Sequence, residues 1–295
     1  MDILGFINKP FGYVLRFFAD ICDGNFAAAV LIFTVFINLI LIPLSIKSQK
    51  SSVQQTRIKP KLDELKKLCG DDKQKYNMEM QKLYQEEGVS MSGGCLPMIV
   101  RLVLMMSIYG VITRPLTYLM GVSEKAIDAA EKLIGGKNVS ELKIIDAVSK
   151  HEIKSPEILE KLDSIDFNLF GLDLTQTPKF GFDFANDFRW IWLIPIGAFL
   201  AQILTSVISM AIQKKNNPEA PSMAGMMLTM PLISLFIGFG LPGGVGFYWI
   251  CSSLIGGLIQ SAIQLLYGPH RMLASYRKKE IAKQLDFENK QIDKF

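Results

Sequence analysis

Long apolar runs alternate with charged segments along this chain. Crossing the hydrocarbon core of a bilayer takes about 20 apolar residues in a helix. Runs 27–46, 95–112, 190–212 and 245–267 meet that length, and run 224–240 is shorter. The pattern predicts an all-α membrane protein with five transmembrane helices, in segments 26–47, 93–113, 189–212, 224–241 and 245–267.

The charges between the runs predict an orientation. The totals are nearly balanced, with 32 Lys and Arg against 28 Asp and Glu, so the distribution is more informative than the sum. Lysine and arginine collect in segments 48–92, 213–223 and 268–295, and such segments stay in the cytoplasm. The N-terminal segment 1–25 and the loop 114–188 are then outside, since a long loop translocates largely regardless of its charge.

Segment 1–25 is expected to be an external amphipathic interfacial helix. In its sequence PFGYVLRFFAD, Pro10 suits a first-turn position. Phe11, Val14, Leu15 and Phe18 fall on one helical face, and aromatic side chains suit the headgroup layer. The helix is therefore predicted to lie on the outer leaflet. We see no cleavable signal peptide in this segment.

Segment 48–92 reads as a cytoplasmic hairpin of two charged helices around Cys69 to Asp72. Pro60 is expected to kink or restart the first helix. The hairpin is predicted to be a mobile guide, with a solvated connector as the alternative, because its apolar seam is thin: Leu62, Leu65 and Leu68, then Tyr76, Met80, Leu83 and Tyr84. In the loop 114–188, residues 141–153 and 156–165 have helical patterns, and 167–174 reads as strand or turn.

Two polar residues interrupt the first two spans. Arg101 lies nine residues after Ser92, and Asn38 lies nine residues before Lys47. At 1.5 Å per helical residue, both come out about 13 Å from the cytoplasmic interface. A guanidinium at this depth costs about 2.5–3.5 kcal/mol on insertion scales, so it usually faces a wet cavity or a partner. Snorkelling of Arg101 to cytoplasmic headgroups is the alternative.

Polar side chains recur on single faces of two later spans. Spacings of three, four or seven residues keep each set on one helix face. The sets are Gln202, Thr205, Ser206, Ser209 and Gln213 in the third span, and Ser253, Gln260 and Gln264 in the fifth. We predict a polar, water-filled groove closed toward the outside and open to the cytoplasm. Hydrogen bonding between packed helices is the alternative reading of each stripe.

Several other classes are disfavoured. The apolar runs contain no Asp or Glu, and both histidines, His151 and His270, lie outside them. An intramembrane enzyme would need a nucleophile with a base, paired acids or metal ligands. A secondary transporter would need inverted repeats and broken helices, and no internal repeat is visible. The four cysteines show no metal-binding spacing, and no disulfide is expected.

Several motifs, in this order, resemble those of the YidC family of membrane protein insertases, relatives of the mitochondrial Oxa and chloroplast Albino proteins. They are KPFGYVLRFF, LIPLSIKSQKS, GGCLPM, FNLFGLDL and LPGGVGFYWICSSLIGGLIQ. The resemblance implies a five-span core in the bacterial plasma membrane, with the C-terminus in the cytoplasm. It implies insertion without covalent catalysis and without a cofactor.

The resemblance also implies partners: nascent membrane proteins, the ribosome, the signal-recognition targeting route, the Sec translocon and membrane lipids. The basic tail 268–295 could contact ribosomal RNA weakly through its phosphates. A plain positive-inside anchor is the alternative for this tail.

The chain departs from the family pattern at the groove. Asn38 stands where the family has its groove arginine, Arg101 stands where glutamine is usual, and Ser253 stands where asparagine is frequent. The positive charge and the amide are thus exchanged between positions 38 and 101, which are predicted to lie at the same depth in the membrane. The substrate groove implied by the residues and the resemblance together consists of Arg101, Asn38, Gln202, Ser206, Ser209, Ser253 and Gln260.

Overall fold

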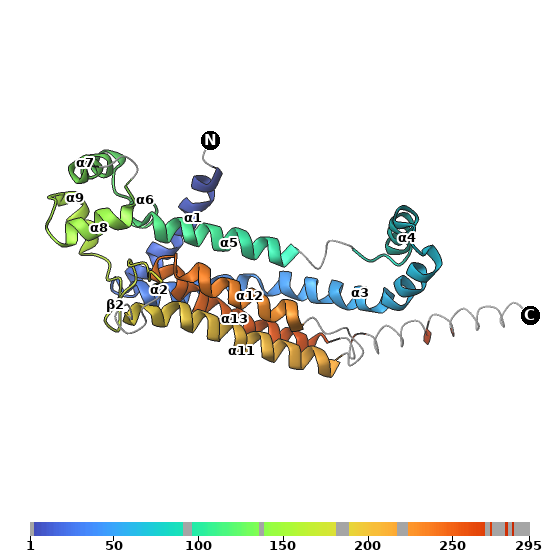
Figure 1. Cartoon of the computed structure of the whole chain (residues 1–295). Helices are drawn as coiled ribbons and strands as arrows, with labels where there is room; N and C mark the ends of the chain where they lie inside the picture. The colour runs from blue at the N-terminus through green and yellow to red at the C-terminus, as the bar shows by residue number, and fades with distance from the viewer. Residues whose placement is uncertain are drawn as a thin grey trace, which may run out of the picture. The chain divides into compact units, whose positions relative to one another are not determined.

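The computed structural model describes residues 3–90, 96–135, 139–180, 189–216 and 224–268, with single positions 272, 281, 282 and 285. It is mostly helical, with one two-stranded sheet in the described part (Figure 1). The predicted span entry 93–95, most of the loop 213–223 and most of the tail 268–295 lie outside the described residues. The chain forms two compact units. The first comprises Met1–Ile40, Arg101–Val207 and Met223–Leu258, and the second Leu41–Val100, Ile208–Ser222 and Ile259–Phe295.

Within the described ranges, two helical segments are long and apolar enough to cross a membrane: Trp190–Lys215 and Gly243–Leu266. A third qualifies if α2 (Phe26–Ile40) and α3 (Ile42–Cys69) are joined as one bent span. The segments Ile99–Thr113 and Thr229–Gly238 are shorter apolar helices. The first begins close to residues that are not described. The chain is therefore a membrane-type helical protein with two to three evident spans, and five spans remain a prediction.

Helix α1 (Ile3–Ile21) begins earlier than its sequence suggested. Pro10 lies inside the helix, so the expectation that it marks the first turn was wrong. The predicted apolar face is real, but it packs inward: Leu15 is fully buried. Phe11 also makes an edge-to-face contact with Phe33 of α2, at 6.0 Å between ring centroids. This burial outweighs the hydrogen bond that a proline removes from the helix. A second apolar set, Phe6, Tyr13 and Phe17, is exposed.

The segment between the second and third predicted spans folds into short helices and a hairpin. These are α6 (Pro115–Tyr118), α7 (Glu124–Ile134), α8 (Glu141–Ser149), α9 (Pro156–Leu162), β1 (Asn168–Leu169) and β2 (Leu172–Asp173). The helical patterns at 141–153 and 156–165 and the strand-or-turn at 167–174 are confirmed. Ile144 and Ile158 are fully buried between the helices. Phe170 and Gly171 both have positive φ, at 50° and 86°, which the tight turn of a two-residue hairpin requires.

The chain after this hairpin caps the start of α13 (Gly243–Leu266). The backbone N–H groups of Gly243 and Gly244 donate to the carbonyls of Gln176 and Leu174, each at 2.8 Å. A helix start leaves its first N–H groups without partners inside the helix, and these two bonds satisfy two of them. The LPGG turn that distinguishes the sequence therefore anchors the fifth predicted span to the segment 174–176.

In the second unit, α3 continues through Pro60 to Cys69 without a break. The prediction was that Pro60 kinks or restarts this helix. The restart is wrong, because Pro60 removes a single hydrogen bond and its exposed ring lies inside one continuous helix; the kink stays a prediction. Leu68 was expected to join the seam but is 81% exposed. Val53, Ile58 and Val89, which lie outside the predicted seam, are among the buried apolar residues of this unit.

An ionic contact also closes the hairpin formed by α3 and α4 (Lys73–Glu86). Glu87, just after α4, accepts a hydrogen bond from Arg57 at 2.8 Å and pairs with Lys61. The amide of Gln55 donates to the carbonyl of Ser90 at 3.1 Å. At the tip, the side chain of Asp72 caps α4 by accepting from two backbone N–H groups. The hairpin therefore has more fixed contacts than its thin seam predicted.

We expect Glu87→Gln to loosen this hairpin by about 1 kcal/mol, the usual upper size of a partly exposed ion pair. The hydrogen bond from Lys61 holds the pKa of the Glu87 carboxyl below its ordinary value. The stabilisation is therefore present above the unfolded carboxyl pKa of about 4.3 and lost as the pH falls through the lower folded value. The protection factors of the amides in residues 53–90, which are exchange rates corrected for the intrinsic pH dependence, should fall with acid in the parent and depend less on pH in the variant. Equal exchange at all pH values in both proteins would contradict this role, and Glu86→Gln is the matched control.

Candidate functional site

The structure brings Arg101 and Asn38 together at one glycine of another helix. A Cβ placed at Gly256 of α13 would lie 3.1 Å from Nη2 of Arg101 and 3.1 Å from Oδ1 of Asn38. These two atoms are therefore no farther apart than twice that distance. Arg101 comes from α5 (Leu96–Thr113), Asn38 from α2 and Gly256 from α13. Three helices therefore meet at this point, and the two polar residues for which the sequence predicted the same depth in the membrane lie close together.

The orientation of the Asn38 amide is set by its own helix. Its Nδ2 donates to the backbone carbonyl of Thr34 at 2.8 Å. This bond turns the amide oxygen toward Gly256 and the guanidinium of Arg101. An amide oxygen carries partial negative charge, so its position beside a cation is favourable. The side chain of Arg101 is itself exposed, which leaves its remaining N–H groups available to a ligand or to water.

The part of α13 beside Arg101 differs from the predicted polar stripe. Tyr248 lies within electrostatic range of Arg101 and shares a hydrogen bond with Ser252. Tyr248, Ser252 and Gly256 are spaced by four residues and so occupy one helix face, whereas Ser253 lies about 100° around the helix from Ser252. Sequence reasoning missed this face because glycine and tyrosine were not counted as polar-site residues. The adjacent glycines Gly256 and Gly257 in the sequence could have indicated that other helices approach α13 closely at this point.

The other predicted groove residues have mixed surroundings. Gln202 on α11 (Leu193–Asn216) accepts a hydrogen bond from Ser234 on α12 (Ala224–Gly238) at 3.0 Å, which favours the helix-packing alternative for this residue. Ser206 is half-buried in the same unit. Ser209 and Gln260 belong to the second unit, where Nε2 of Gln260 lies 3.5 Å from Oε1 of Gln49. A role for these residues in one groove remains a prediction.

Comparison with known proteins identifies the family. The family model described as 60Kd inner membrane protein matches residues 17–268, which includes every helix named at the site. The chain belongs to this family. Relatives named membrane protein insertase YidC are 31% identical over 251 residues in Rickettsia massiliae and 29% over 251 residues in Rickettsia felis, each covering 84% of this chain and 37% of the relative. Another, from Bradyrhizobium diazoefficiens, is 31% identical over 263 residues, or 88% of this chain and 36% of the relative.

The chain thus spans little more than a third of the length of these relatives. The family match confirms the resemblance inferred from the motifs. Arg101, Asn38 and Gly256 all lie within the matched residues, so the three-helix meeting point falls inside the region that the family shares.

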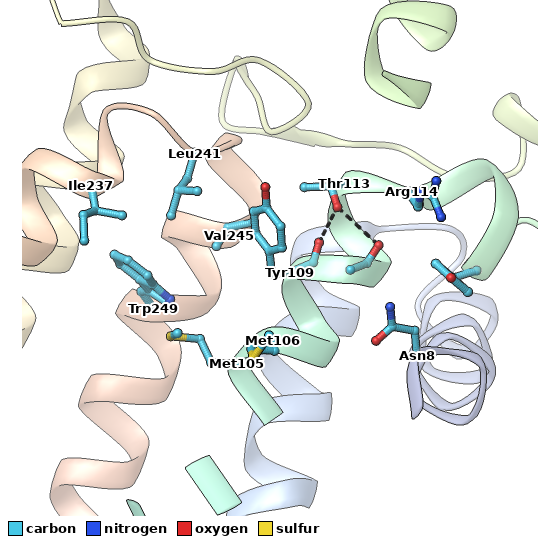
Figure 2. Close-up of a pocket in the computed structure, with 12 residues that line it drawn as sticks. Asn8, Met105, Met106, Tyr109, Thr113, Arg114, Ile237, Leu241, Val245 and Trp249 are labelled. Carbon is cyan, nitrogen blue, oxygen red and sulfur yellow. Dashed lines mark hydrogen bonds between the residues drawn. The ribbon is translucent and has the colours of Figure 1, made fainter. Parts of the chain in front are cut away.

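Two cavities of this membrane-family chain lie away from Arg101. The first, of about 480 Å³, is mostly apolar and lies between α1, α5 and α6 on one side and α12 and α13 on the other (Figure 2). The second, of about 840 Å³, is more polar and is lined by α1, the end of α5, α6, α7 and the start of α8. None of the seven predicted groove residues lines either cavity. Neither cavity could be predicted from local patterns, because the walls come from segments distant in the sequence.

Glu141 is a buried carboxyl in the wall of the second cavity. It accepts hydrogen bonds from the backbone N–H of Thr117 at 3.0 Å and from its hydroxyl at 2.6 Å. Burial raises the pKa of Glu141 above its ordinary value, against the lowering effect of these bonds and of the charge on Arg114. These contacts join α6 to α8, so Glu141 stabilises the segment between the second and third predicted spans.

Proposed function

We propose that this chain is a membrane protein insertase in which the meeting point of Arg101, Asn38 and Gly256 receives the polar end of a client segment. The observation that carries the proposal is an exposed guanidinium beside an amide oxygen inside otherwise apolar helices. Family membership and the YidC relatives support it. A charge that costs several kcal/mol to place among apolar helices is retained most simply because it acts on clients.

The electrostatic step follows from the geometry. A client segment destined for the outside carries polar or acidic groups, and burying them without partners is costly. Arg101 offsets part of that cost and attracts acidic side chains more strongly than bulk water would, because the effective dielectric constant beside the helices is low. Asn38 holds one side of the site, which leaves the opposite side of the guanidinium for the client.

The apolar part of the client needs a route into lipid. Leu200, Leu204 and Val207 on α11 are exposed at helical spacing and form one stripe. On α13, Leu254 and Leu258 are exposed in the same way. A client helix that moves along these side chains gains about 25 cal/mol for each Å² that it removes from water. In this proposal the release requires neither a cofactor nor nucleotide hydrolysis.

The proposal includes the predicted topology. Five spans, with the N-terminus outside and the C-terminus in the cytoplasm, place segment 48–92 and tail 268–295 where nascent chains, the ribosome and the Sec translocon are found. The short fourth span, 224–241, fits a locally thinned bilayer and so shortens the distance to be crossed. Ser206, Ser209, Ser253 and Gln260 would extend the polar surface from Arg101 toward the cytoplasm.

Single cysteines introduced along α5 test the proposal directly. In membrane vesicles, a water-soluble maleimide should label a position on the Arg101 face, such as Met105, from the cytoplasmic side more readily than a position on the opposite face, such as Val103. Labelling should fall when a stalled client is bound. Equal labelling around the helix, or labelling that a client does not change, would contradict a groove at this place.

Gly256 provides a prediction of its own. The added branches of Gly256→Leu would occupy the space now shared by Nη2 of Arg101 and Oδ1 of Asn38. We expect insertion of acidic-tailed clients to fall about tenfold, equivalent to about 1.4 kcal/mol of lost interaction. Gly256→Ala should be milder, because the long arginine side chain can shift by a few tenths of an ångström and alanine favours a helix by about 1 kcal/mol over glycine.

The matched control for Gly256→Leu is Leu265→Phe, which adds volume to an exposed side of the same helix, away from the proposed client route. Protein level and thermal stability should be equal in the two variants, and only Gly256→Leu should lose insertion in an assay with purified protein in liposomes. A fully active Gly256→Leu protein would show that the meeting point is not the client site.

A further inference from the structure

The apolar cavity between α1 and α13 contains two buried polar atoms that have no partner within the described residues. Oδ1 of Asn8 and Nε1 of Trp249 make no hydrogen bond. Both residues line the same cavity of about 480 Å³, and Asn8 is only 5% exposed. In Figure 2 the amide of Asn8 and the indole nitrogen of Trp249 face the space between them from opposite walls. One is an acceptor and the other is a donor.

Close packing keeps Asn8 from turning its amide elsewhere. A Cβ at Gly110 would lie 2.2 Å from Nδ2 of Asn8, so α5 can approach α1 this closely only with glycine at that position. A Cβ at Gly12 would lie 2.1 Å from the carbonyl oxygen of Tyr118. Because neither glycine has a Cβ, α1 can pack directly against α5 and α6 at these two positions. The amide oxygen is thereby held at the cavity wall, where an unsatisfied polar atom costs about 1–3 kcal/mol.

The rest of the wall is suited to hydrocarbon. Met105, Met106, Leu241 and Val245 line it, and thioether side chains adapt to flexible chains. Its volume lies in the range of small-molecule sites, which combine apolar walls with a few placed polar groups. Ile237 lines the cavity and is 51% exposed, and Tyr109 is 44% exposed. The cavity therefore continues onto surfaces that face lipid if these helices span the membrane.

We propose that this cavity binds a glycerolipid that has a free hydroxyl group. An ester carbonyl of the lipid accepts from Nε1–H of Trp249, and the hydroxyl donates to Oδ1 of Asn8. The acyl chain lies against the methionine and leucine side chains. A lipid of this class satisfies both orphaned atoms at once, whereas an alkyl chain without these groups satisfies neither. This inference is independent of the insertase proposal, because its two polar contacts use neither Arg101, Asn38 nor Gly256.

Fluorescence of Trp249 in liposomes tests the proposal. The protein, which has three tryptophans, is reconstituted in phosphatidylcholine with increasing fractions of brominated diacylglycerol or brominated phosphatidylglycerol, whose bromine atoms quench nearby indoles. The Trp249→Phe protein provides the background from the other two. We expect quenching of Trp249 to reach saturation at a bulk fraction of brominated lipid about tenfold lower than random mixing would require. Two net hydrogen bonds are sufficient for this tenfold enrichment at the site. Quenching that simply follows the bulk fraction would overturn the proposal.

Three comparisons assign the contacts. Asn8→Leu should lower the enrichment about threefold, the effect of one net hydrogen bond. An ether-linked lipid, which lacks the ester carbonyl, should lower it similarly with the protein unchanged, so the result does not depend on a variant that folds poorly. Thr113→Val is the matched control, because the Thr113 hydroxyl lines the cavity but already donates to the carbonyl of Tyr109 at 2.7 Å. Equal enrichment in Asn8→Leu and the parent, or equal enrichment of brominated phosphatidylcholine, would mean that water or ordinary surrounding lipid fills the cavity.

The two lipids share the hydroxyl and the esters but differ in charge. Arg114 lies at the edge of the cavity and is exposed. If phosphatidylglycerol is the preferred form, Arg114→Gln should remove its advantage over diacylglycerol and leave the enrichment of diacylglycerol unchanged. If both lipids bind equally in the parent, the neutral glyceride part alone is recognised. Enrichment of neither lipid overturns the proposal.

Discussion

Arg101→Leu should reduce the insertion of clients with acidic translocated tails about tenfold or more and leave clients with neutral tails much less affected. A charge pair about 4 Å apart near a protein surface is worth up to about 4 kcal/mol, and each 1.4 kcal/mol is a factor of ten. Arg101→Lys should retain much of the activity, because it keeps the positive charge. The measurement is the fraction of client protected from external protease after synthesis in the presence of proteoliposomes.

The control for this experiment is the client itself. A pair of clients that differ only in Asp against Asn in the tail reports the charge-dependent part separately from general damage to the protein. Equal loss for both tails would assign Arg101 a structural role. A variant that inserts both normally would show that the guanidinium only snorkels to headgroups.

Exchanging the two side chains should restore what each single change removes. Asn38→Arg alone places two guanidiniums around the same point at Gly256, where each of the two residues now has an atom 3.1 Å from the position that a Cβ would take. Like charges this close repel by several kcal/mol. Arg101→Gln alone leaves no charge. The double variant Asn38→Arg with Arg101→Gln retains one cation and one amide, and we expect most of the activity to return.

A double-mutant cycle measures this coupling. Insertion of an acidic-tailed client and the level of folded protein are determined for the parent, both single variants and the double variant. Loss in the singles with recovery in the double would demonstrate that the two walls act on one site. A double variant as inactive as the worse single, at normal protein level, would contradict a shared site for Arg101 and Asn38.

The length and periodicity of apolar runs determined much of the helical arrangement. The long runs 190–212 and 245–267 are helices in the structure, and the patterns at 141–153 and 156–165 form α8 and α9. Such features are local, because a helix is closed by hydrogen bonds within a few residues and its buried face repeats along its own sequence. Counting residues also placed Arg101 and Asn38 at one depth, because the helical rise is constant.

Tertiary packing decided what no local pattern contains. Pro10 remains inside α1 because the burial of Leu15 and its neighbours outweighs one lost hydrogen bond. Gly256 meets Arg101 and Asn38, and Glu87 joins Arg57 and Lys61, only because segments distant in sequence pack together.

The cavity containing Asn8 and Trp249 has the same origin. Its walls come from residues 8 to 249, and each of the two polar atoms would have a partner in an isolated helix exposed to water. Whether a polar atom is satisfied depends on what surrounds it in three dimensions. The sequence therefore determined which helices form and which of their faces are apolar. The approach of α2, α5 and α13 decided where Arg101 meets Asn38, and the approach of α1, α5 and α13 decided which polar atoms lack a partner, because only packing brings distant segments together and removes buried atoms from water.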